Sequence, residues 1–247
     1  MTISLELVSV VLPTYDERDN IGPLMDRILA SVEQPVEIIV VDDDSPDGTW
    51  QVVEERAAED ARIRLLRRME ERGLTSALIA GIDLARGDVI AWMDCDLSMP
   101  PEVLPRLLEV TETVDIAVGS RYVRGGADVG HSLVGQIFSR TINFWASLFL
   151  GWGIKDYTSG FMAVRRRVFE QITLRGDYGE YCIDLLYSAH RLGYRIKEVP
   201  YECVPREAGE SKTAENAWGY VRRGTNYVTT ILRLRFRPPP RSPEARG

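Results

Sequence analysis

The sequence predicts one large α/β domain with a doubly wound sheet, in which helices cover both faces of the strands. Three observations predict this fold class. Short apolar runs rich in valine and isoleucine alternate with helical patterns, and 247 residues with 45% hydrophobic content can bury a substantial core. In addition, the polar clusters of the first half follow the apolar runs, where parallel strands would end. We therefore expect ligands to bind beyond the carboxyl ends of the strands.

The expected strands are short and almost wholly apolar, as strands covered on both faces are. They are the segments 7–12, 36–42, 63–66, 89–93 and 115–119. Between them, three segments repeat apolar residues with the period of a helix that buries one face. These expected helices are 20–30, 49–61 and 74–85. The alternation of strand and helix indicates repeated β-α units.

Charge and cysteine content exclude several classes of protein. The formal net charge is −7, so the chain lacks the extended basic surface that nucleic-acid binding requires. Cys95, Cys182 and Cys203 are odd in number and widely spaced, which indicates neither a disulfide framework nor a zinc site. His131 and His190 have no partner at ligand spacing, and we expect both to be structural or solvent-facing. The first six residues carry no signal-peptide pattern, so we expect a cytoplasmic protein.

The most informative pair of residues closes the fourth expected strand. Asp94 and Asp96 end an apolar run, and two carboxylates at the carboxyl end of a buried strand repel each other and lose hydration. A divalent cation compensates both effects, and Mg²⁺ or Mn²⁺ prefers one or two carboxylates together with water and phosphate oxygens. We therefore expect this pair to hold a metal against a phosphorylated ligand. A chance surface turn is the alternative.

Two further polar clusters follow the first and second expected strands. They read PTYDE at 13–17 and DDDSPDGT at 42–49. A turn followed by a helix cap explains the residues SPDGT at 45–49. It does not explain the three aspartates at 42–44, which repel one another at the end of a buried strand and take no part in the turn. Carboxylates here can accept hydrogen bonds from a nucleobase or a ribose, and Tyr15 can stack on a base. Because a glycine-rich phosphate loop is absent, a nucleotide diphosphate would need a metal and arginines.

The order of these and later motifs resembles the family 2 inverting glycosyltransferases of the GT-A fold, and among them the dolichol-phosphate mannose synthases. The motifs are PTYDE at 13–17, DDDSPDGT at 42–49, DCDLSMPPE at 94–102, GSRY at 119–122, SGF at 159–161 and PREAGESK at 205–212. The resemblance covers roughly residues 5–215. It implies a Rossmann-like, doubly wound mixed sheet with amphipathic interface helices in the carboxyl-terminal half, and a catalytic domain at 1–216.

The resemblance also implies an activity. Such enzymes transfer mannose from GDP-mannose to dolichyl or polyprenyl phosphate with inversion, giving a β-linked lipid-phosphate mannose, with Mg²⁺ or Mn²⁺ as cofactor. A glucosyltransferase that uses UDP-glucose would share the fold, the metal and the lipid acceptor. A non-catalytic protein that binds nucleotide sugar or lipid is a second alternative. A nucleotidyltransferase fits less well, because its entry motif rich in glycine and lysine is absent after the first strand.

Roles carried over from the family fall on matching positions of this chain. Donor binding is implied for Pro13, Tyr15, Glu17, Val40, Asp42, Asp44, Asp94, Cys95, Asp96, Arg121, Arg206 and Lys212. Contacts to the acceptor phosphate are implied for Arg121, Arg140, Arg206 and Ser211, and catalytic roles for Asp94, Asp96, Arg121 and Arg206. The implied metal ligands are Asp94, Asp96 and Ser98.

The chain departs from the family pattern at three places. Ser98 stands where the family usually has glutamine, and Gly135 and Gln136 stand where an arginine is common. Near Gly179 a lysine common in the family is missing, and Asp184 replaces a usual glutamate. Acceptor-phosphate contacts in the region after Arg121 are therefore expected to rest on Arg140.

Two segments can supply the membrane-facing surface that a lipid acceptor requires. Residues 131–152 are rich in large apolar side chains, but polar residues break the run too often for the ~20 apolar residues of a membrane span. We expect an interfacial helix there, with a core helix as the alternative. Residues 217–237 mix apolar residues with arginines and predict a basic amphipathic helix on an anionic leaflet.

The prolines at 238–240 end that helix, and we expect 238–247 to be a disordered tail. The expected location is peripheral, on the cytoplasmic face of a membrane. A separate membrane-anchoring protein is a further expected partner.

Overall fold

The computed structural model describes residues 7–151, 153–206 and 217–236, with the backbone alone at 217–223. Seven strands form one sheet in the order β3-β2-β1-β4-β7-β5-β8. In chain order these strands are β1 Val8–Thr14, β2 Val36–Asp42, β3 Ile63–Arg67, β4 Val89–Trp92, β5 Ile116–Ser120, β7 Met162–Arg165 and β8 Ile196–Pro200. Two further strands, β6 Ala127–Asp128 and β9 Glu202–Cys203, pair with each other in parallel.

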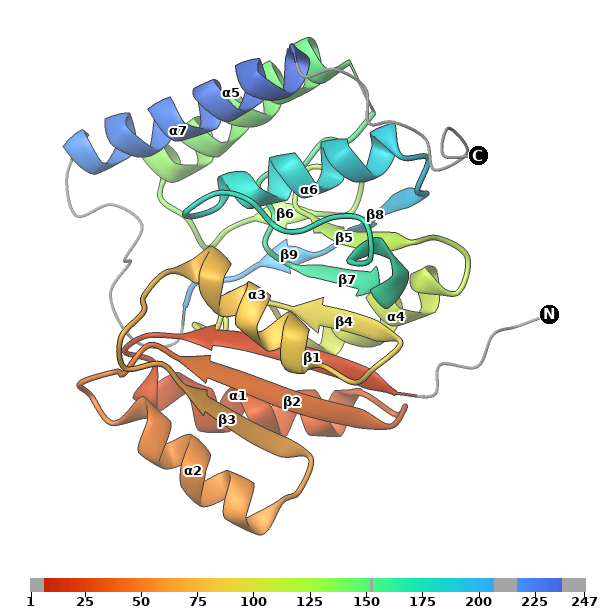
Figure 1. The fold of residues 1–247 in the computed structure, drawn as a ribbon. Coiled ribbons are helices and arrows are strands. Elements are labelled where there is room, and N and C mark those ends of the chain that lie inside the picture. Colours follow the sequence, from red (N-terminus) through yellow and green to blue (C-terminus); the bar gives the residue numbers. More distant parts are fainter. Residues whose placement is uncertain (1–6, 152, 207–216, 237–247) are drawn as a thin grey trace.

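Helices cover both faces of the sheet (Figure 1). They are α1 Arg18–Ser31, α2 Thr49–Glu59, α3 Leu74–Leu84, α4 Leu104–Thr111, α5 Leu133–Leu150, α6 Glu180–Arg191 and α7 Ala217–Arg235. Two 3-10 turns, Pro101–Val103 and Arg166–Val168, precede α4 and follow β7. The α/β sheet with helices on both faces confirms the fold class expected from the sequence.

The strand side chains alternate between two separate cores, one on each face. Val11, Ile39 and Trp92 point to the face covered by α3 and α6, whereas Val10 and Ile38 point to the face covered by α1 and α4. All five are almost fully buried, and such burial stabilises by about 1.5–3 kcal/mol for each large aliphatic side chain. This two-sided burial explains why the strands read as continuous apolar runs.

Strand β7 makes the sheet mixed. It runs antiparallel to β4 and to β5, while the pairs β1–β2, β1–β4, β2–β3 and β5–β8 are parallel. The parallel strands β1 and β4 lie side by side, so the loops that follow them open at the same edge. This arrangement brings the PTYDE cluster and the acidic pair together.

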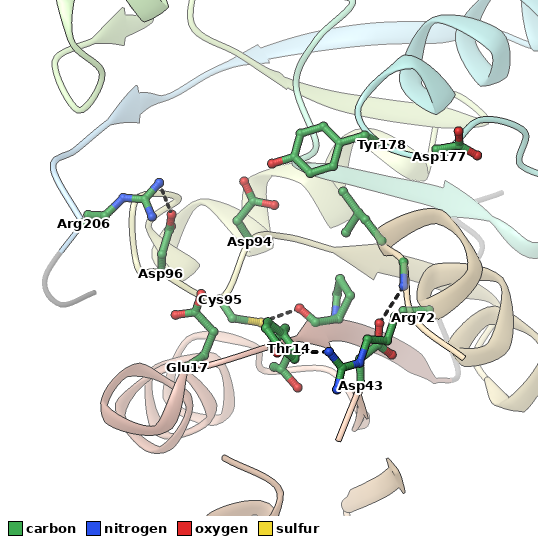
Figure 2. Close-up of a pocket in the computed structure, with 15 residues that line it drawn as sticks. Thr14, Glu17, Asp43, Arg72, Asp94, Cys95, Asp96, Asp177, Tyr178 and Arg206 are labelled. Atoms are coloured by element: carbon green, nitrogen blue, oxygen red, sulfur yellow. Dashed lines mark hydrogen bonds and ion pairs between the residues drawn. The ribbon is translucent and has the colours of Figure 1, made fainter. Parts of the chain in front are cut away.

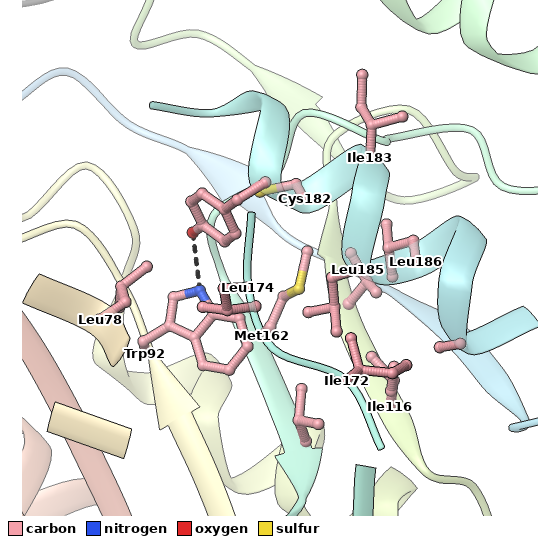
Figure 3. Packing of buried hydrophobic residues seen from close by; sticks show 14 of the residues in the cluster. Leu78, Trp92, Ile116, Met162, Ile172, Leu174, Cys182, Ile183, Leu185 and Leu186 are labelled. Atoms are coloured by element: carbon pink, nitrogen blue, oxygen red, sulfur yellow. Dashed lines mark hydrogen bonds between the residues drawn. The ribbon is translucent and has the colours of Figure 1, made fainter. Parts of the chain in front are cut away.

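A buried hydrogen bond joins α6 to the centre of the sheet. Trp92 of β4 donates from Nε1 to the hydroxyl oxygen of Tyr181, at 2.9 Å, inside an otherwise apolar cluster (Figure 3). A buried indole N–H without an acceptor would cost about 1–3 kcal/mol. The bond therefore holds the start of α6, and with it the loop at Asp177 and Tyr178, next to the end of β4.

The amino-terminal elements agree closely with the expected ones. The five expected strands and three expected helices are all present, with ends shifted by a residue or two. Among the strands the largest shift is in β1, which continues through Pro13 and Thr14 because these residues pair with Val41 and Asp42 of β2. No element was assigned from the sequence to the segments that form α4, β7, α6 and β8.

Helices α5 and α7 pack together at one side of the molecule, beyond α6 (Figure 1). Phe138 and Tyr227 meet edge to face, with ring centroids 6.1 Å apart, and Arg233 of α7 pairs with Asp184 of α6 at 2.9 Å. Among the described residues, none of the helices combines the length and the hydropathy that a membrane span needs.

Candidate active site

A cavity of about 410 Å³ opens at the carboxyl ends of β1 and β4 (Figure 2). Its walls come from segments far apart in the chain: the loops after β1 and β4, the loops before α3 and α6, and the strand exit that carries Arg206. The volume lies in the range of small-molecule sites. The lining residues are Pro13, Thr14, Tyr15, Glu17, Asp43, Arg72, Gly73, Leu74, Ala77, Asp94, Cys95, Asp96, Asp177, Tyr178 and Arg206.

Asp94 and Asp96 both face this cavity (Figure 2). Asp94 is accessible from the cavity, yet it is crowded by surrounding protein. Desolvation of its carboxyl group by the surrounding protein atoms, and the nearby carboxylate of Asp96, raise the pKa of Asp94 to about 7, although the residue is exposed toward the cavity. A carboxyl group that resists ionisation beside a second carboxylate marks a place where positive charge is favoured. The oxygen donors and their crowding fit a hard divalent cation.

Asp96 is held in place by its neighbours. One carboxylate oxygen, Oδ1, accepts from the backbone N–H of Ser98 at 3.0 Å, and the other, Oδ2, pairs with Arg206 at 3.0 Å. Between Asp96 and Ser98 the chain turns sharply, because Leu97 adopts the left-handed conformation with φ of 63°. Such strain in a residue other than glycine is concentrated at functional sites.

Ser98 lies behind this turn. Its side chain is buried and is not among the residues that line the cavity, and its described contact with Asp96 is through the backbone. The role of Ser98 as a metal ligand therefore stays a prediction, and the structure gives it an orienting contact instead.

Tyr15 and Arg72 form an aromatic and cationic wall of the cavity. Arg72 donates from Nη1 to the hydroxyl oxygen of Tyr15 at 3.2 Å, and its guanidinium lies 5.1 Å from the centre of the ring. An aromatic ring and a planar cation suit a nucleobase or a phosphate. Arg72 was not singled out from the sequence, although its position between the third strand and the third helix places it at the strand ends.

The carboxylates of the acidic run at 42–44 accept hydrogen bonds from other groups of the protein. Asp42 is fully buried and accepts from Thr14 Oγ1 at 2.9 Å and from Ser45 Oγ at 2.6 Å. Asp44 accepts from Arg67 Nε at 2.7 Å. Asp43 accepts from Arg68 Nε at 2.7 Å and from the backbone N–H of Gly73 at 2.8 Å.

The positions of the three aspartates differ from the roles expected of them in donor binding. Asp43, which carried no expected role of its own, lines the cavity, whereas Asp42 and Asp44 are outside its lining. Val40 is fully buried within β2, also outside the lining. The direct donor contacts expected of Val40, Asp42 and Asp44 stay predictions, and their described role is to shape the loop.

Arg121 lies deep in the protein and is bound by Asp156. Its Nε and Nη2 each lie 2.8 Å from one carboxylate oxygen of Asp156, and Nη2 also donates to Thr158 at 2.9 Å. Burial alone would lower the pKa of Arg121, but Asp156 holds it well above the ordinary value. The arginine is therefore charged.

Arg121 and Arg140 share a second depression of about 550 Å³ rather than the cavity at Asp94. Arg140 is exposed there, over the ring of Tyr122 at 5.7 Å, and Lys155 adds a further positive charge. This depression borders α5 at Phe144. The expected residues Ser211 and Lys212 lie outside the described part of the chain.

The expected site is thus divided between two places. Pro13, Tyr15, Glu17, Asp94, Cys95, Asp96 and Arg206 meet at the cavity, and Arg121 and Arg140 meet at the depression beside α5. Arg206 pairs with Asp96 at 3.0 Å, and its expected contact with phosphate stays a prediction. The cavity combines carboxylates for a metal with an aromatic residue and two arginines, a set suited to a nucleotide diphosphate.

The sequence matches the profile of glycosyl transferase family 2 over residues 9–173. Polyprenol monophosphomannose synthase of Mycolicibacterium smegmatis is 41% identical over 82% of this chain and 79% of its own length. Undecaprenyl-phosphate mannosyltransferase of Micrococcus luteus is 39% identical over 83% of this chain and 86% of its own length. Dolichol-phosphate mannosyltransferase of Pyrococcus furiosus is also 39% identical, and the match spans 58% of that longer protein.

Solved structures share the fold. Glucosyl-3-phosphoglycerate synthase of Mycobacterium tuberculosis, crystallised with UDP, superposes with a TM-score of 0.70. The match covers 94% of this chain and 81% of that one, at 22% sequence identity. Another structure of that synthase contains Mn²⁺, UDP and phosphoglyceric acid.

Proposed function

Because the chain belongs to glycosyl transferase family 2, we propose that it transfers mannose from GDP-mannose to a dolichyl or polyprenyl phosphate, giving a β-linked lipid-phosphate mannose. It is a glycosyltransferase, and its relatives at about 40% identity are named for mannose transfer to polyprenyl phosphates. The observation that carries the proposal is the meeting of Asp94 and Asp96 with Tyr15, Arg72 and Arg206 in one cavity.

The acidic pair supports a divalent cofactor, Mg²⁺ or Mn²⁺. Asp94 and Asp96 would hold it through their carboxylate oxygens, and the bound metal would neutralise charge on the departing diphosphate. Other structures of this fold contain Mn²⁺ together with a nucleotide. Ser98 would act by holding Asp96 in orientation through its backbone N–H.

The transfer itself needs positioning more than proton removal. A phosphate oxygen of the lipid attacks the anomeric carbon as the bond from that carbon to the GDP oxygen breaks, so GDP leaves with the electron pair and the anomeric centre inverts. The lipid phosphate is already ionised near neutral pH, so a strong general base is unnecessary. Preorganised charge is then the main contribution of the protein. Arg206 is placed to serve the diphosphate, since it already contacts Asp96.

The lipid acceptor keeps its hydrocarbon tail in the bilayer. The protein therefore requires a surface that contacts the membrane, where the phosphate of the lipid can reach the active site. Helix α5 presents large apolar side chains to solvent beside the depression that holds Arg121 and Arg140. We place α5 and α7 against the cytoplasmic face of a membrane, with the protein docked peripherally. A separate membrane-anchoring protein could reinforce this docking. Among the residues of these helices whose side chains the structure describes, the exposed large apolar ones are Leu133, Val134, Ile137, Phe144, Trp145, Leu148, Phe149, Val228 and Leu232.

A transfer assay tests the proposal. The purified chain is given a polyprenyl phosphate with GDP-mannose or UDP-glucose, in Mn²⁺, in Mg²⁺ or in a chelator, and lipid-phosphate sugar is measured. We expect mannose transfer that the chelator abolishes, and a loss of roughly 10²–10³-fold in Asp96→Asn, since a charge-stabilising group is removed. Asp88→Asn is the matched control, because Asp88 precedes the same strand at its opposite end.

Two results would contradict the proposal. One is glucose transfer from UDP-glucose in preference to mannose transfer. The other is transfer that proceeds unchanged in the chelator and in Asp96→Asn.

A further inference from the structure

A second group of metal-ligating side chains lies outside the cavity at Asp94. Asp128, His131 and Cys203 each offer one ligand atom, and these atoms all lie within 4.8 Å of one another. The Nδ1 atom of His131 is 2.8 Å from Asp128 Oδ1 and 3.7 Å from Cys203 Sγ. None of the three lines the cavity at the acidic pair.

The backbone fixes the relative positions of these residues. Asp128 and Cys203 are register partners in the β6–β9 pair, and the N–H groups of Val129 and Gly130 both donate to the carbonyl oxygen of Cys203. A Cβ at Gly130 would lie 2.2 Å from the carbonyl oxygen of Val204, so glycine permits the close approach. The loop is thereby held against β9 with His131 over Cys203.

The distances between the three ligand atoms suit an ion with tetrahedral coordination. Zinc binds sulfur at about 2.3 Å and nitrogen or carboxylate oxygen at about 2.1 Å, so adjacent ligands lie about 3.4–3.6 Å apart. The observed 3.7 Å between Sγ and Nδ1 matches this spacing. The 2.8 Å between Nδ1 and Oδ1 is a hydrogen-bond distance, and a small rotation of the exposed His131 ring would open it.

The surroundings favour positive charge at the same point. Asp128 and then Cys203 raise the pKa of His131 to about 10, so these two groups stabilise positive charge on the imidazole ring. The second oxygen of Asp128, Oδ2, lies 3.5 Å from Arg121 Nη1 and from the hydroxyl oxygen of Tyr122, which orients the carboxylate. Partners of this kind orient the ligands of metal sites.

We propose that Asp128, His131 and Cys203 form a zinc site, separate from the catalytic metal. The side chains of Asp128 and Cys203 are almost fully buried, and that of His131 is 42% exposed, so a fourth ligand would come from the solvent side. The ion would tie the segment before α5 to the strand that leads to Arg206. It would therefore brace the two segments that flank the depression and the cavity.

Cobalt substitution tests the site directly. The metal-free full chain is titrated with Co²⁺, and absorption by thiolate-to-cobalt charge transfer is followed. We expect a band that saturates at one equivalent, disappears on addition of Zn²⁺, and is absent from Cys203→Ser and His131→Gln. The band should remain in Asp96→Asn, in Cys95→Ser and in Cys182→Ala, which remove the proposed catalytic ligand and the other two thiols.

Thermal unfolding gives a second measurement. Zn²⁺ should raise the melting temperature of the wild type and leave that of His131→Gln unchanged; this exposed residue can be replaced without emptying the core. Absence of the band in folded wild type, its persistence in Cys203→Ser, or its loss in Cys95→Ser would overturn the site. So would an equal Zn²⁺-dependent rise in His131→Gln. Because these readouts do not involve transfer, they stand apart from the test of the transferase activity.

Discussion

Arg121 and Arg206 share an expected role at phosphate but occupy different environments. Arg121 is 7% exposed and grips the fully buried Asp156 with two nitrogens. Arg206 is 27% exposed, lines the cavity and pairs with Asp96 at its edge. A buried ion pair that loses one partner leaves an uncompensated charge in a low dielectric, whereas a more exposed pair is weakened by water. The two arginines should therefore respond differently to substitution.

We expect Arg121→Met to destabilise the fold by about 3–5 kcal/mol, because Asp156 would remain buried without its partner. Arg206→Met should cost about 1 kcal/mol or less while it abolishes most transfer. Urea unfolding of both variants and of the wild type measures the difference. Equal stability of the two variants would show that Asp156 does not depend on Arg121.

Single residues differ in how far the sequence could identify them. Asp94 and Asp96 were predictable because strand-end carboxylates repel each other and require a cation. Arg72 and Asp43 were not, since an arginine or one aspartate in an acidic run has many ordinary roles. The grouping of His131 with Cys203 was beyond sequence reasoning, because 72 residues separate them and only the β6–β9 pairing brings them together.

At the scale of elements, the sequence predicted those with a strong pattern. Strands β1, β2 and β4 are buried along nearly their whole length, and the valine and isoleucine residues in their sequences indicate this burial. Strand β8 contains a lysine, a glutamate and a proline within five residues, so its sequence has no continuous apolar run. Helix α4 follows closely spaced prolines that resemble a turn.

Helix α5 has an apolar face turned outward. Ile137 and Leu148 are 65% and 59% exposed, whereas its inward face buries Ile142, Asn143, Ala146 and Leu150. A core helix would bury the large side chains instead, so that alternative does not describe α5. The proposed membrane contact gives these residues an apolar environment.

We expect the double variant Ile137→Glu/Leu148→Glu to bind anionic vesicles at least about tenfold more weakly than the wild type, because burial of one aliphatic side chain is worth about 1.5–3 kcal/mol. Neither residue lines the depression beside α5, so the acceptor contacts stay intact. Vesicle flotation at low and high salt measures binding. Met69→Glu is the control, since Met69 is 71% exposed on the loop after β3. Flotation of the double variant at the wild-type level would contradict the assignment of α5 to the membrane.

At the scale of the whole molecule, the cavity joins segments from nearly the full length of the chain. The loop after β1 and the loop before α6 both contribute to its wall, and Arg206, which follows β9 in the chain, adds to the lining. The fold class and the sheet edge that carries the site were predictable from the pattern of units. The division of the arginines between two places was not, because it depends on how α5 and the loop at Asp156 pack around Arg121.

A ligand that bridges these segments should stabilise the entire domain. At one hundred times its dissociation constant, a ligand that binds only the folded state adds about 2.7 kcal/mol, which raises the melting temperature of a domain of this size by roughly 5–10 °C. We expect GDP to produce this rise with Mn²⁺ and a much smaller one in a chelator, because without metal the diphosphate meets Asp94 and Asp96 unscreened. Differential scanning fluorimetry measures it, with UDP as a comparison. Asp88→Asn should behave as the wild type, and Asp96→Asn should lose the dependence on metal. A full rise in the chelator would mean that GDP does not bind through a metal at the acidic pair.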